Sequence, residues 1–353
     1  MSSIKEVANE AGVSIATVSH VINNTRFVSD EVRVRVLKAI EKCSYYPNAH
    51  ARSLASGKSK IIGLVVSDIT NPFFPELVKA IEAVAFEKGY DVILSNTDYN
   101  TERTSHYVRR LIERNVAGVA IMTSEMDKGL VDELARRKLS TVFLDVGQPE
   151  KHMNNLRIGY AEGVEQAIQH LAGLGHERIA FISGPTHLSS ARRRLEAYRG
   201  IMERLFPGQP EMIFDGNFKV SGGRSCAAEI MRLSPEPMPT AVMAANDLMA
   251  IGAISEFESV GLHVPDQISV IGFDDIAFAA VCRPALTTVH VPLKTLGAKA
   301  VEVLLSSMED LTTRGVEVRI PAALVVRDST APAPSGGRKD DKRKKRELHR
   351  HSV

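Results

Sequence analysis

Apolar side chains in the first part of the chain recur at the three- and four-residue spacing of amphipathic helices. A first stripe consists of Ile4, Val7, Ala8 and Ala11. Gly12 follows, and because glycine adopts a positive φ angle easily, we expect the first helix to end there. Ser14 stands where its hydroxyl can cap a second helix. The inward side of that second helix carries Val18, Val21 and Ile22.

A third helix is predicted after Ser29, which is placed as its cap. Asp30 and Glu31 lie in the first turn, where negative charge is favoured by the helix dipole. The inward side of this helix carries Val32, Val36 and Ile40. Three short helices with a tight turn after the first are typical of a helix-turn-helix DNA-binding module. A small three-helix bundle with no nucleic-acid role would show the same periodicity.

The second predicted helix leaves one face free to meet DNA. An α-helix fits the major groove, where its leading residues reach base edges. His20 can donate a hydrogen bond to guanine, while Ile15 and Ala16 can contact a thymine methyl group. Short neutral side chains suited to the phosphate backbone are Ser14, Thr17, Ser19 and Asn23.

A short segment from Pro47 to Gly57 follows the three helices. Pro47 suits the first turn of a helix, and Gly57 suits its end. Because a helix of two turns is marginal alone in water, we expect this segment to be disordered until DNA and a second copy support it. Arg52 can reach a phosphate, and Ala51 is small enough for close approach to DNA.

The pattern changes at Ile61, where short apolar runs begin to alternate with amphipathic stretches. The predicted strands contain IIGLVV, YDVILSN, AGVAIM, STVFLD, RIAFISG, MIFDG, TAVMA and ISVIGFD. The predicted helices lie near 73–88, 103–114, 129–138, 189–205, 222–232 and 247–260. Apolar strands joined by helical crossovers indicate parallel sheets covered on both faces. The fold class is therefore α/β, with two doubly wound lobes joined by crossings near 145–160, 275–295 and 316–328.

Polar side chains follow the carboxyl ends of these strands, which is where ligands bind in open α/β sheets. The candidate effector-binding residues are Ser67, Asn71, Phe73, Asp145, Arg194, Phe218, Asn246 and Asp274. Carboxylates, amides and an arginine suit sugar hydroxyl groups, and phenylalanine rings cover apolar C–H surface. Helix capping is an alternative role for Asp68 and Asp247, and core packing is one for Phe74. For Arg192 and Arg193 we expect a solvated helix face.

Charge is distributed unevenly along the chain, although the net charge is only +2. Residues 1–60 hold nine basic and five acidic side chains, and residues 331–353 hold eight and three. The body between them carries −7 and would repel a phosphate backbone. The Pro- and Gly-led charged tail is expected to be disordered, either as a weak DNA anchor or as a solvated terminus.

No motif indicates a metal, a cofactor or a membrane. Cys43, Cys226 and Cys282 lie far apart and lack metal-ligand spacing. Neither GxxxxGK[ST] nor GxGxxG occurs. The start lacks the apolar core of a secretory signal, and no run approaches the ~20 apolar residues of a membrane helix. We therefore expect a cytoplasmic protein with no cofactor and no metal.

The N-terminal segment resembles the DNA-binding headpiece of the lactose/galactose repressor family. The run VSHVIN-x-TRFV is especially similar to the purine and ribose repressor branch. The body resembles ribose-type periplasmic binding proteins, and the runs FLDV and GP…SSARxRL are similar to the family's effector domain. The resemblance covers residues 1–330. It implies a homodimer that binds a pseudopalindromic operator in double-stranded DNA and is controlled by a small-molecule effector, a sugar, bound between the lobes.

The resemblance also assigns roles to single residues. It implies that the major-groove base readers are Ile15, Ala16 and His20. Leu54, helped by Ala51, would enter the minor groove and unstack a base step, at a cost of a few kcal/mol; a core contact is the alternative for Leu54. The DNA-backbone contacts that the resemblance implies are Thr17, Ser19, Asn23, Ser29 and Tyr45, and we expect further backbone contacts at Ser14, Asn48 and Arg52. Ala55 departs from the basic residue of the purine branch, and Val291 departs from the glutamine of several sugar-binding members.

The sequence thus predicts a transcriptional repressor, not an enzyme, with four parts. These are a headpiece at 1–46, a hinge helix and linker at 47–60, an effector-binding and dimerisation body at 61–330, and a tail at 331–353. A purine-corepressed repressor is the first alternative. A sugar-binding transport receptor would explain the body but not the headpiece. An enzyme on the same sheets lacks a nucleotide motif.

Overall fold

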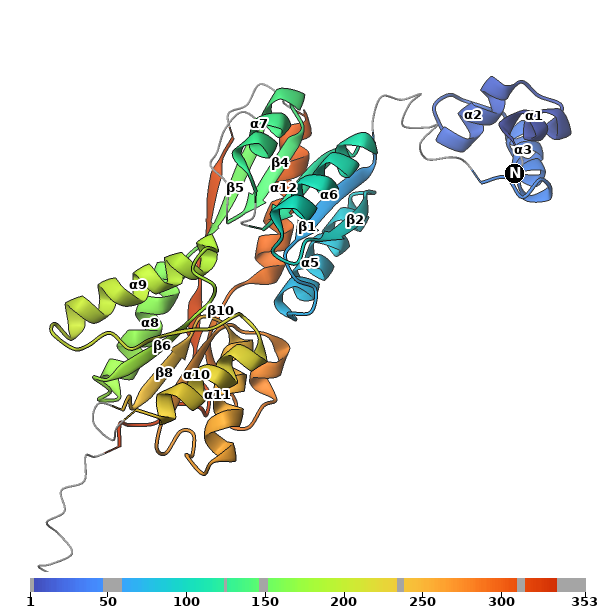
Figure 1. The fold of residues 1–353 in the computed structure, drawn as a ribbon. Coiled ribbons are helices and arrows are strands. Elements are labelled where there is room, and N and C mark those ends of the chain that lie inside the picture. Colours follow the sequence, from blue (N-terminus) through green and yellow to red (C-terminus); the bar gives the residue numbers. More distant parts are fainter. Residues whose placement is uncertain are drawn as a thin grey trace, which may run out of the picture. The chain divides into compact units, whose positions relative to one another are not determined.

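The structure, a computed structural model, divides into two compact units, Met1–Lys60 and Ile61–Val353 (Figure 1). It describes residues 3–46, 59–123, 126–145, 152–233, 238–309 and 315–334. Four predicted DNA-contact residues lie outside the described residues: Asn48, Ala51, Arg52 and Leu54. The tail after residue 334 lies outside them as well.

The first unit contains the three predicted helices, α1 (Ile4–Ala11), α2 (Ile15–Asn23) and α3 (Asp30–Lys42). Their apolar stripes meet in one small core around Val7, Val18 and Val36. Gly12 ends α1 at a φ of 62°, and Ser14 caps α2 by accepting a hydrogen bond from the Thr17 N–H at 3.1 Å. Both features agree with the sequence pattern.

Ser29 differs from its expected capping role. It occupies the N-cap position of α3, but its side chain makes no capping hydrogen bond. The acidic residues Asp30 and Glu31 still lie in the first turn, where their charge stabilises the N-terminal end of the helix.

The first lobe of the body is built on a parallel sheet with the strand order β11-β5-β4-β3-β1-β2. Its strands are β1 (Ile61–Val66), β2 (Asp91–Asn96), β3 (Gly118–Met122), β4 (Ser140–Leu144), β5 (Met153–Ile158) and β11 (Glu317–Ile320). Because side chains alternate along a strand, Leu64 and Val65 belong to different cores. The core with Leu64 includes α5 (Phe73–Glu87) and α12 (Leu293–Glu309). The core with Val65 includes α6 (Thr101–Glu113) and α7 (Lys128–Arg137).

The second lobe repeats this plan with the strand order β12-β10-β9-β8-β6-β7. Its strands are β6 (Ile179–Ser183), β7 (Ile213–Asp215), β8 (Ala241–Ala244), β9 (Ser269–Asp274), β10 (Thr287–His290) and β12 (Ala323–Val325), and only β12 is antiparallel to its neighbour. Its helices are α8 (Tyr160–Gly173), α9 (Ser189–Leu205), α10 (Val220–Met231), α11 (Asp247–Ser259) and the short 3-10 helix η1 (Ala277–Ala280). Helices α8 and α9 pack together, as do α10 and α11 (Figure 1).

Within the described residues of the body, three connections join the lobes, as the sequence predicts. They run from β5 to α8, from β10 to α12 and from β11 to β12. The first lies at the end of the expected range near 145–160, because Met153–Ile158 of that range form β5, a strand of the first sheet. Its polar residues Asn154 and Asn155 are buried and hydrogen-bonded, Asn155 to Glu317 of the neighbouring strand β11 at 3.3 Å.

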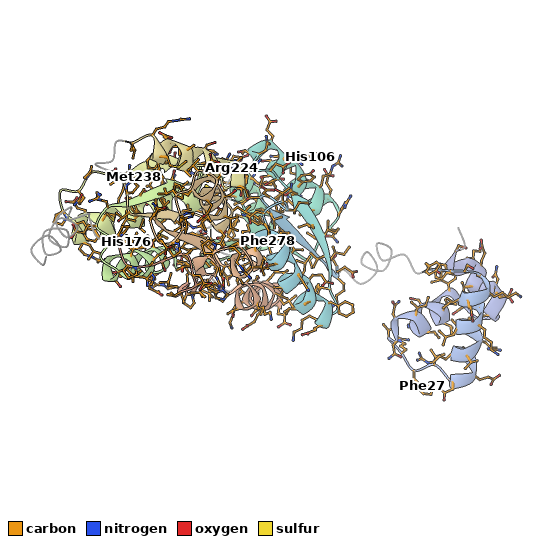
Figure 2. The ribbon with its side chains drawn as sticks, turned by 90° about the horizontal axis from the view of Figure 1, so that it is seen from below. Phe27, His106, His176, Arg224, Met238 and Phe278 are labelled. Atoms are coloured by element: carbon orange, nitrogen blue, oxygen red, sulfur yellow. The ribbon has the colours of Figure 1, made fainter. Side chains whose placement is uncertain are left out.

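The body continues past the expected boundary at residue 330. The carbonyl oxygen of Ala331 lies 2.9 Å from Nε2 of the buried His176, and the Ala333 N–H donates to the Leu174 carbonyl at 2.8 Å. His176 belongs to the second lobe (Figure 2). No helix within the described ranges is long and apolar enough to cross a membrane.

Candidate functional site

The candidate DNA-reading face lies on α2. Ile15 is 47% exposed, and Ala16 is exposed beside it. Nδ1 of His20 lies 2.8 Å from Oγ1 of Thr25, just after the helix, which orients the imidazole ring. Asn23 donates to the Ser19 hydroxyl at 3.2 Å. These short, ordered polar groups fit contacts to phosphate and base edges, and their DNA roles remain predictions.

Two aromatic residues of the headpiece differ in their exposure to solvent. Phe27, in the turn between α2 and α3, is 96% exposed (Figure 2). It was not among the predicted contacts, although an aromatic residue within a polar turn is a visible sequence signal. Tyr45, predicted to contact the DNA backbone, is half-buried and packs against the headpiece core.

A cavity of about 60 Å³ lies between the two lobes of the body. All eight predicted effector residues line it: Ser67, Asn71, Phe73, Asp145, Arg194, Phe218, Asn246 and Asp274. Strand ends of both sheets meet there, as expected for doubly wound sheets. Lining residues that the sequence reasoning missed include Tyr99, Met122, Thr123, Leu144, Tyr160 and Ser190. Tyr160 begins α8, a helix that the apolar pattern did not predict.

Arg194 is the central charged group of the second lobe's side of the cavity. Its guanidinium carbon lies 4.4 Å from the ring centre of Tyr160 and 4.3 Å from that of Phe273. Its Nη2 donates to Oδ1 of Asp274 at 3.2 Å. Its Nε is buried and has no hydrogen-bond partner within the described part of the chain. Such a donor favours a ligand that supplies an acceptor.

Asp145 holds the corresponding position in the first lobe. Its Oδ1 accepts from the Ile158 N–H at 3.0 Å and from Nη1 of Arg193 at 3.1 Å. Its Oδ2 is buried and makes no hydrogen bond of good geometry within the described part of the chain, although the Tyr160 hydroxyl lies close enough to this carboxyl group to lower its pKa. Arg193 therefore differs from the solvated residue we expected, whereas Arg192 is exposed and pairs with Glu196 along α9.

Burial changes the acidity of both carboxyl groups. It raises the pKa of Asp145 to about 6, against the attraction of Arg193. It raises the pKa of Asp274 to about 7, against the attraction of Arg194. Asp145, Phe218 and Asp274 also have positive φ angles of 80°, 63° and 118°. Backbone conformations that L-residues rarely adopt cluster at functional sites, so this strain supports a binding role.

Other predicted residues are held by internal hydrogen bonds. Ser67 donates to the Met122 carbonyl at 3.1 Å, and Asn71 accepts from the Phe73 N–H at 3.1 Å. Asn246 caps α11 by accepting from the Met249 N–H, and it donates to the Phe218 carbonyl at 2.9 Å. These side chains therefore shape the cavity at least as much as they offer hydrogen bonds to a ligand.

Helix capping does not explain Asp68 or Asp247, which directly follow the cavity residues Ser67 and Asn246 in the sequence. Asn246, rather than Asp247, is the N-cap of α11. Asp247 is fully buried and accepts hydrogen bonds from the Ile276 N–H at 2.8 Å and from the Thr288 hydroxyl. It thereby supports the loop that follows Asp274. Asp68 accepts from the backbone and hydroxyl of Thr70, within the turn before α5.

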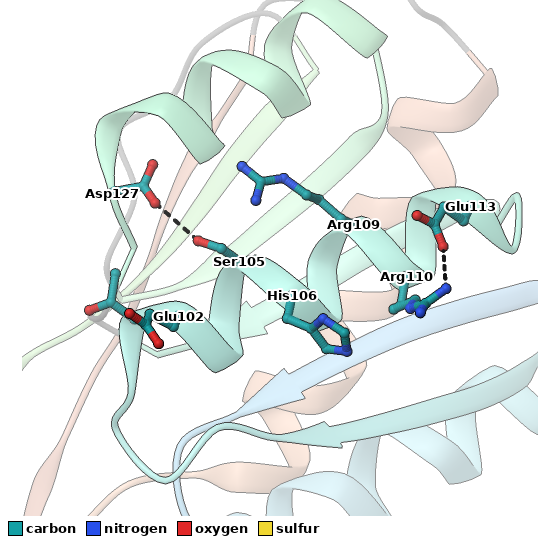
Figure 3. Close-up of a pocket in the computed structure, with 8 residues that line it drawn as sticks. Glu102, Ser105, His106, Arg109, Arg110, Glu113 and Asp127 are labelled. Atoms are coloured by element: carbon teal, nitrogen blue, oxygen red, sulfur yellow. Dashed lines mark hydrogen bonds and ion pairs between the residues drawn. The ribbon is translucent and has the colours of Figure 1, made fainter.

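A wider groove of about 490 Å³ lies along α6 beside Asp127 (Figure 3). Its charged groups pair with one another or with neighbours. Ser105 donates to Asp127 at 3.0 Å, Arg110 pairs with Glu113, and Arg109 pairs with Glu133 of α7. Satisfied surface pairs of this kind indicate no ligand. Within the described ranges, no group of three or more His, Cys, Asp or Glu residues could hold a metal ion.

Known proteins resemble both parts of the chain. Residues 3–48 match the family described as bacterial regulatory proteins, lacI family, and residues 168–330 match the periplasmic binding protein-like domain. The chain is 38% identical over 331 residues to the HTH-type transcriptional repressor PurR of Photobacterium profundum, covering 93% of this chain and 98% of the relative. It is 36% identical to the PurR repressor of Pasteurella multocida, with the same coverage.

Solved structures also resemble this chain. The lac repressor dimer bound to operator and the anti-inducer ONPF is 30% identical, with a TM-score of 0.84 and coverage of 94% of this chain and 99% of that one. A LacI family transcriptional regulator from Enterococcus faecium with bound ribose is 30% identical, with a TM-score of 0.70 and coverage of 77% and 99%.

Proposed function

Because this chain belongs to the lacI family of bacterial regulatory proteins, we propose that the cavity between its lobes binds the effector that controls the affinity of the protein for DNA. Membership makes the chain a DNA-binding transcriptional repressor under small-molecule control, and not an enzyme. What we propose beyond this is the chemistry of the effector, the residues that bind it and the residues that read the operator.

The proposed effector is an uncharged sugar. The observation that carries this proposal is the pair of buried, unpaired groups in the cavity, the acceptor Oδ2 of Asp145 and the donor Nε of Arg194. A hydroxyl group both donates and accepts, so neighbouring sugar hydroxyls can satisfy both. Asp145 forms an ion pair with Arg193, and Asp274 forms one with Arg194. A charged ligand would leave one net charge buried, which is costly.

Aromatic rings supply the rest of the proposed site. Phe73 and Phe218 line the cavity and can cover the C–H faces of a sugar ring. The relative that holds ribose supports this choice. A wrong sugar that left one buried polar group unpaired would lose ~1–3 kcal/mol of binding energy, which would provide selectivity.

A purine corepressor is the alternative effector. Two observations favour it: the relatives named PurR, and the stacked rings of Tyr99 and Phe218, whose centres lie 6.4 Å apart. Thermal-shift screening of sugars against hypoxanthine separates the two. A rise in melting temperature with sugars alone supports our proposal, and a rise with hypoxanthine alone refutes it.

On DNA, we propose a homodimer that reads two half-sites about one helical turn apart through α2. The exposed apolar residues Phe278 (Figure 2) and Val281, together with the dimeric lac repressor structure, support self-association. Closure of the lobes around the effector would shift the hinge segments, and a coupling of ~1–3 kcal/mol suffices for regulation of about 5–150-fold.

A footprinting experiment tests the DNA part of the proposal. The full chain should protect an inverted repeat upstream of its regulated genes at moderate salt, and a variant lacking residues 1–57 should lose this protection. If the truncated chain bound the same fragment as tightly as the full chain, the headpiece would not be the DNA-reading module.

A further inference from the structure

One ion pair joins the two lobes directly beside the cavity. Nη1 of Arg193 donates to the backbone carbonyl of Asp145 at 2.9 Å and to its Oδ1 at 3.1 Å. Asp145 follows β4 of the first lobe, and Arg193 belongs to α9 of the second lobe. Both hydrogen bonds therefore cross the cleft and would break if the lobes separated.

The two partners differ in their access to solvent. The Arg193 side chain is 29% exposed, whereas that of Asp145 is 2% exposed and lines the cavity. Arg193 thus reaches in from the surface. The preceding residue, Arg192, is 55% exposed and its ion pair stays within α9, so it offers a matched control of the same type on the same helix.

Arg193 also sets the orientation of the Asp145 carboxylate. Together with the Ile158 N–H, it holds Oδ1 and leaves Oδ2 as the unpaired acceptor. Rotation of this carboxylate would break two hydrogen bonds. The acceptor offered to the effector is consequently fixed by a residue that does not itself line the cavity.

The cavity is too small for the ligand that the site is built to hold. Its volume of about 60 Å³ lies well below the ~300–1,000 Å³ of typical small-molecule pockets. A second contact also crosses the cleft, from the Ala277 N–H of η1 to Oε1 of Glu76 in α5 at 3.3 Å. Access for a sugar-sized molecule therefore requires that these contacts open.

We propose that Arg193 and Asp145 form an interlobe clasp that holds the effector cleft closed, with Arg193 as the positioning residue for Asp145. The clasp rests on the proposed function only in taking this cavity as the effector site. It adds a residue that controls opening of the cleft. Breaking the clasp should increase opening of both lobes near the cavity while leaving the sheets folded.

Hydrogen–deuterium exchange of the full chain without any ligand tests the clasp independently of the effector's identity. Local opening speeds amide exchange without global unfolding. In Arg193→Gln, the peptides containing Ile158 and Ala277 should exchange about tenfold faster than in the wild type, as ~1.4 kcal/mol of lost closure would produce. Exchange in Arg192→Gln should match the wild type, and peptides from the interior of β8 should be unchanged in both variants.

Two further variants separate positioning from general stability. Arg193→Lys keeps the charge and should restore much of the protection. Asp145→Gly removes the side-chain acceptor, suits the φ of 80° at this position and leaves the backbone carbonyl in place. It should speed exchange at Ala277 by no more than Arg193→Gln does, and the double variant should add nothing to Arg193→Gln, because both changes weaken the same contact. The clasp is refuted if Arg193→Gln matches Arg192→Gln, if its effect extends to β8, or if the two single effects add independently.

Discussion

Arg194 and Asp274 form a buried ion pair in the second lobe, with Nη2 and Oδ1 3.2 Å apart and each side chain 6% exposed. The arginine comes from α9 and the aspartate from the end of β9. Stacking of the guanidinium between Tyr160 and Phe273 leaves it little freedom to find another partner. The pair is therefore both part of the proposed effector site and a structural element of the lobe.

Asp274→Ala should lower the free energy of unfolding by about 3–5 kcal/mol, because it leaves the Arg194 charge buried without a partner. Urea unfolding measures this loss, and the effector response should disappear with it. Arg199→Ala, which breaks the exposed pair with Glu211, should cost under ~1 kcal/mol. Equal losses in the two variants would contradict a special role for the buried pair.

The stability of the body should depend on the protonation of Asp145. Since burial raises its pKa to about 6, the folded chain binds this proton more tightly than the unfolded chain. Its contribution to stability is present below about pH 4 and is lost as pH rises through 6. In the wild type, the free energy of unfolding should therefore fall between pH 4 and pH 7. In Asp145→Asn this fall should be smaller than in the wild type by roughly 2–3 kcal/mol. An unchanged pH profile in urea titrations would argue against the raised pKa.

His20→Ala should weaken binding to the specific operator by ~1–3 kcal/mol, because it removes a base contact. Binding to unrelated DNA should change little, since phosphate contacts dominate there. Fluorescence anisotropy on both DNAs at one salt concentration provides the comparison. Parallel losses on the two DNAs would place His20 on the phosphate backbone instead.

Leu54→Ala should also reduce operator binding far more than nonspecific binding, because the Leu54 side chain would unstack only the central base step of the specific operator. DNA bending, measured by energy transfer between end-labelled dyes, should decrease in parallel. A variant with normal bending and normal specificity would assign Leu54 to an ordinary packing contact.

Gly223→Ala should destabilise the second lobe by about 1–3 kcal/mol through overpacking. An added Cβ at Gly223 would lie 2.0 Å from the Met249 backbone oxygen, where α10 meets α11. Gly200→Ala, on the exposed side of α9 with no atom within 4 Å of its new Cβ, should stabilise the chain by ~0.5–1 kcal/mol. Thermal unfolding of both variants checks the opposite signs.

Much of this architecture is readable from local patterns. Helical spacing places the three headpiece helices, and continuous apolar runs place the sheet strands. Residues that follow strand ends, six of them polar and two of them phenylalanines, identify eight residues of the cavity, since parallel strands bring those ends to one edge. These signals work because the burial of a side chain follows the period of its own helix or strand.

The same reasoning fails where a residue's environment is set by distant partners. Strand β5 carries Asn154 and Asn155, which look solvent-exposed in the sequence but are buried through hydrogen bonds to other strands. Asp247 looks like a helix cap, yet it holds Ile276 and Thr288 instead.

Sequence alone therefore determined the secondary structure of the headpiece, the two-lobed α/β class, the family and the composition of the cavity. Tertiary structure decided which charges meet: Arg193 with Asp145, 48 positions away, and Arg194 with Asp274, 80 positions away. The reason is physical. Periodicity reports which face of an element is apolar, whereas an ion pair depends on how separate elements approach one another in space.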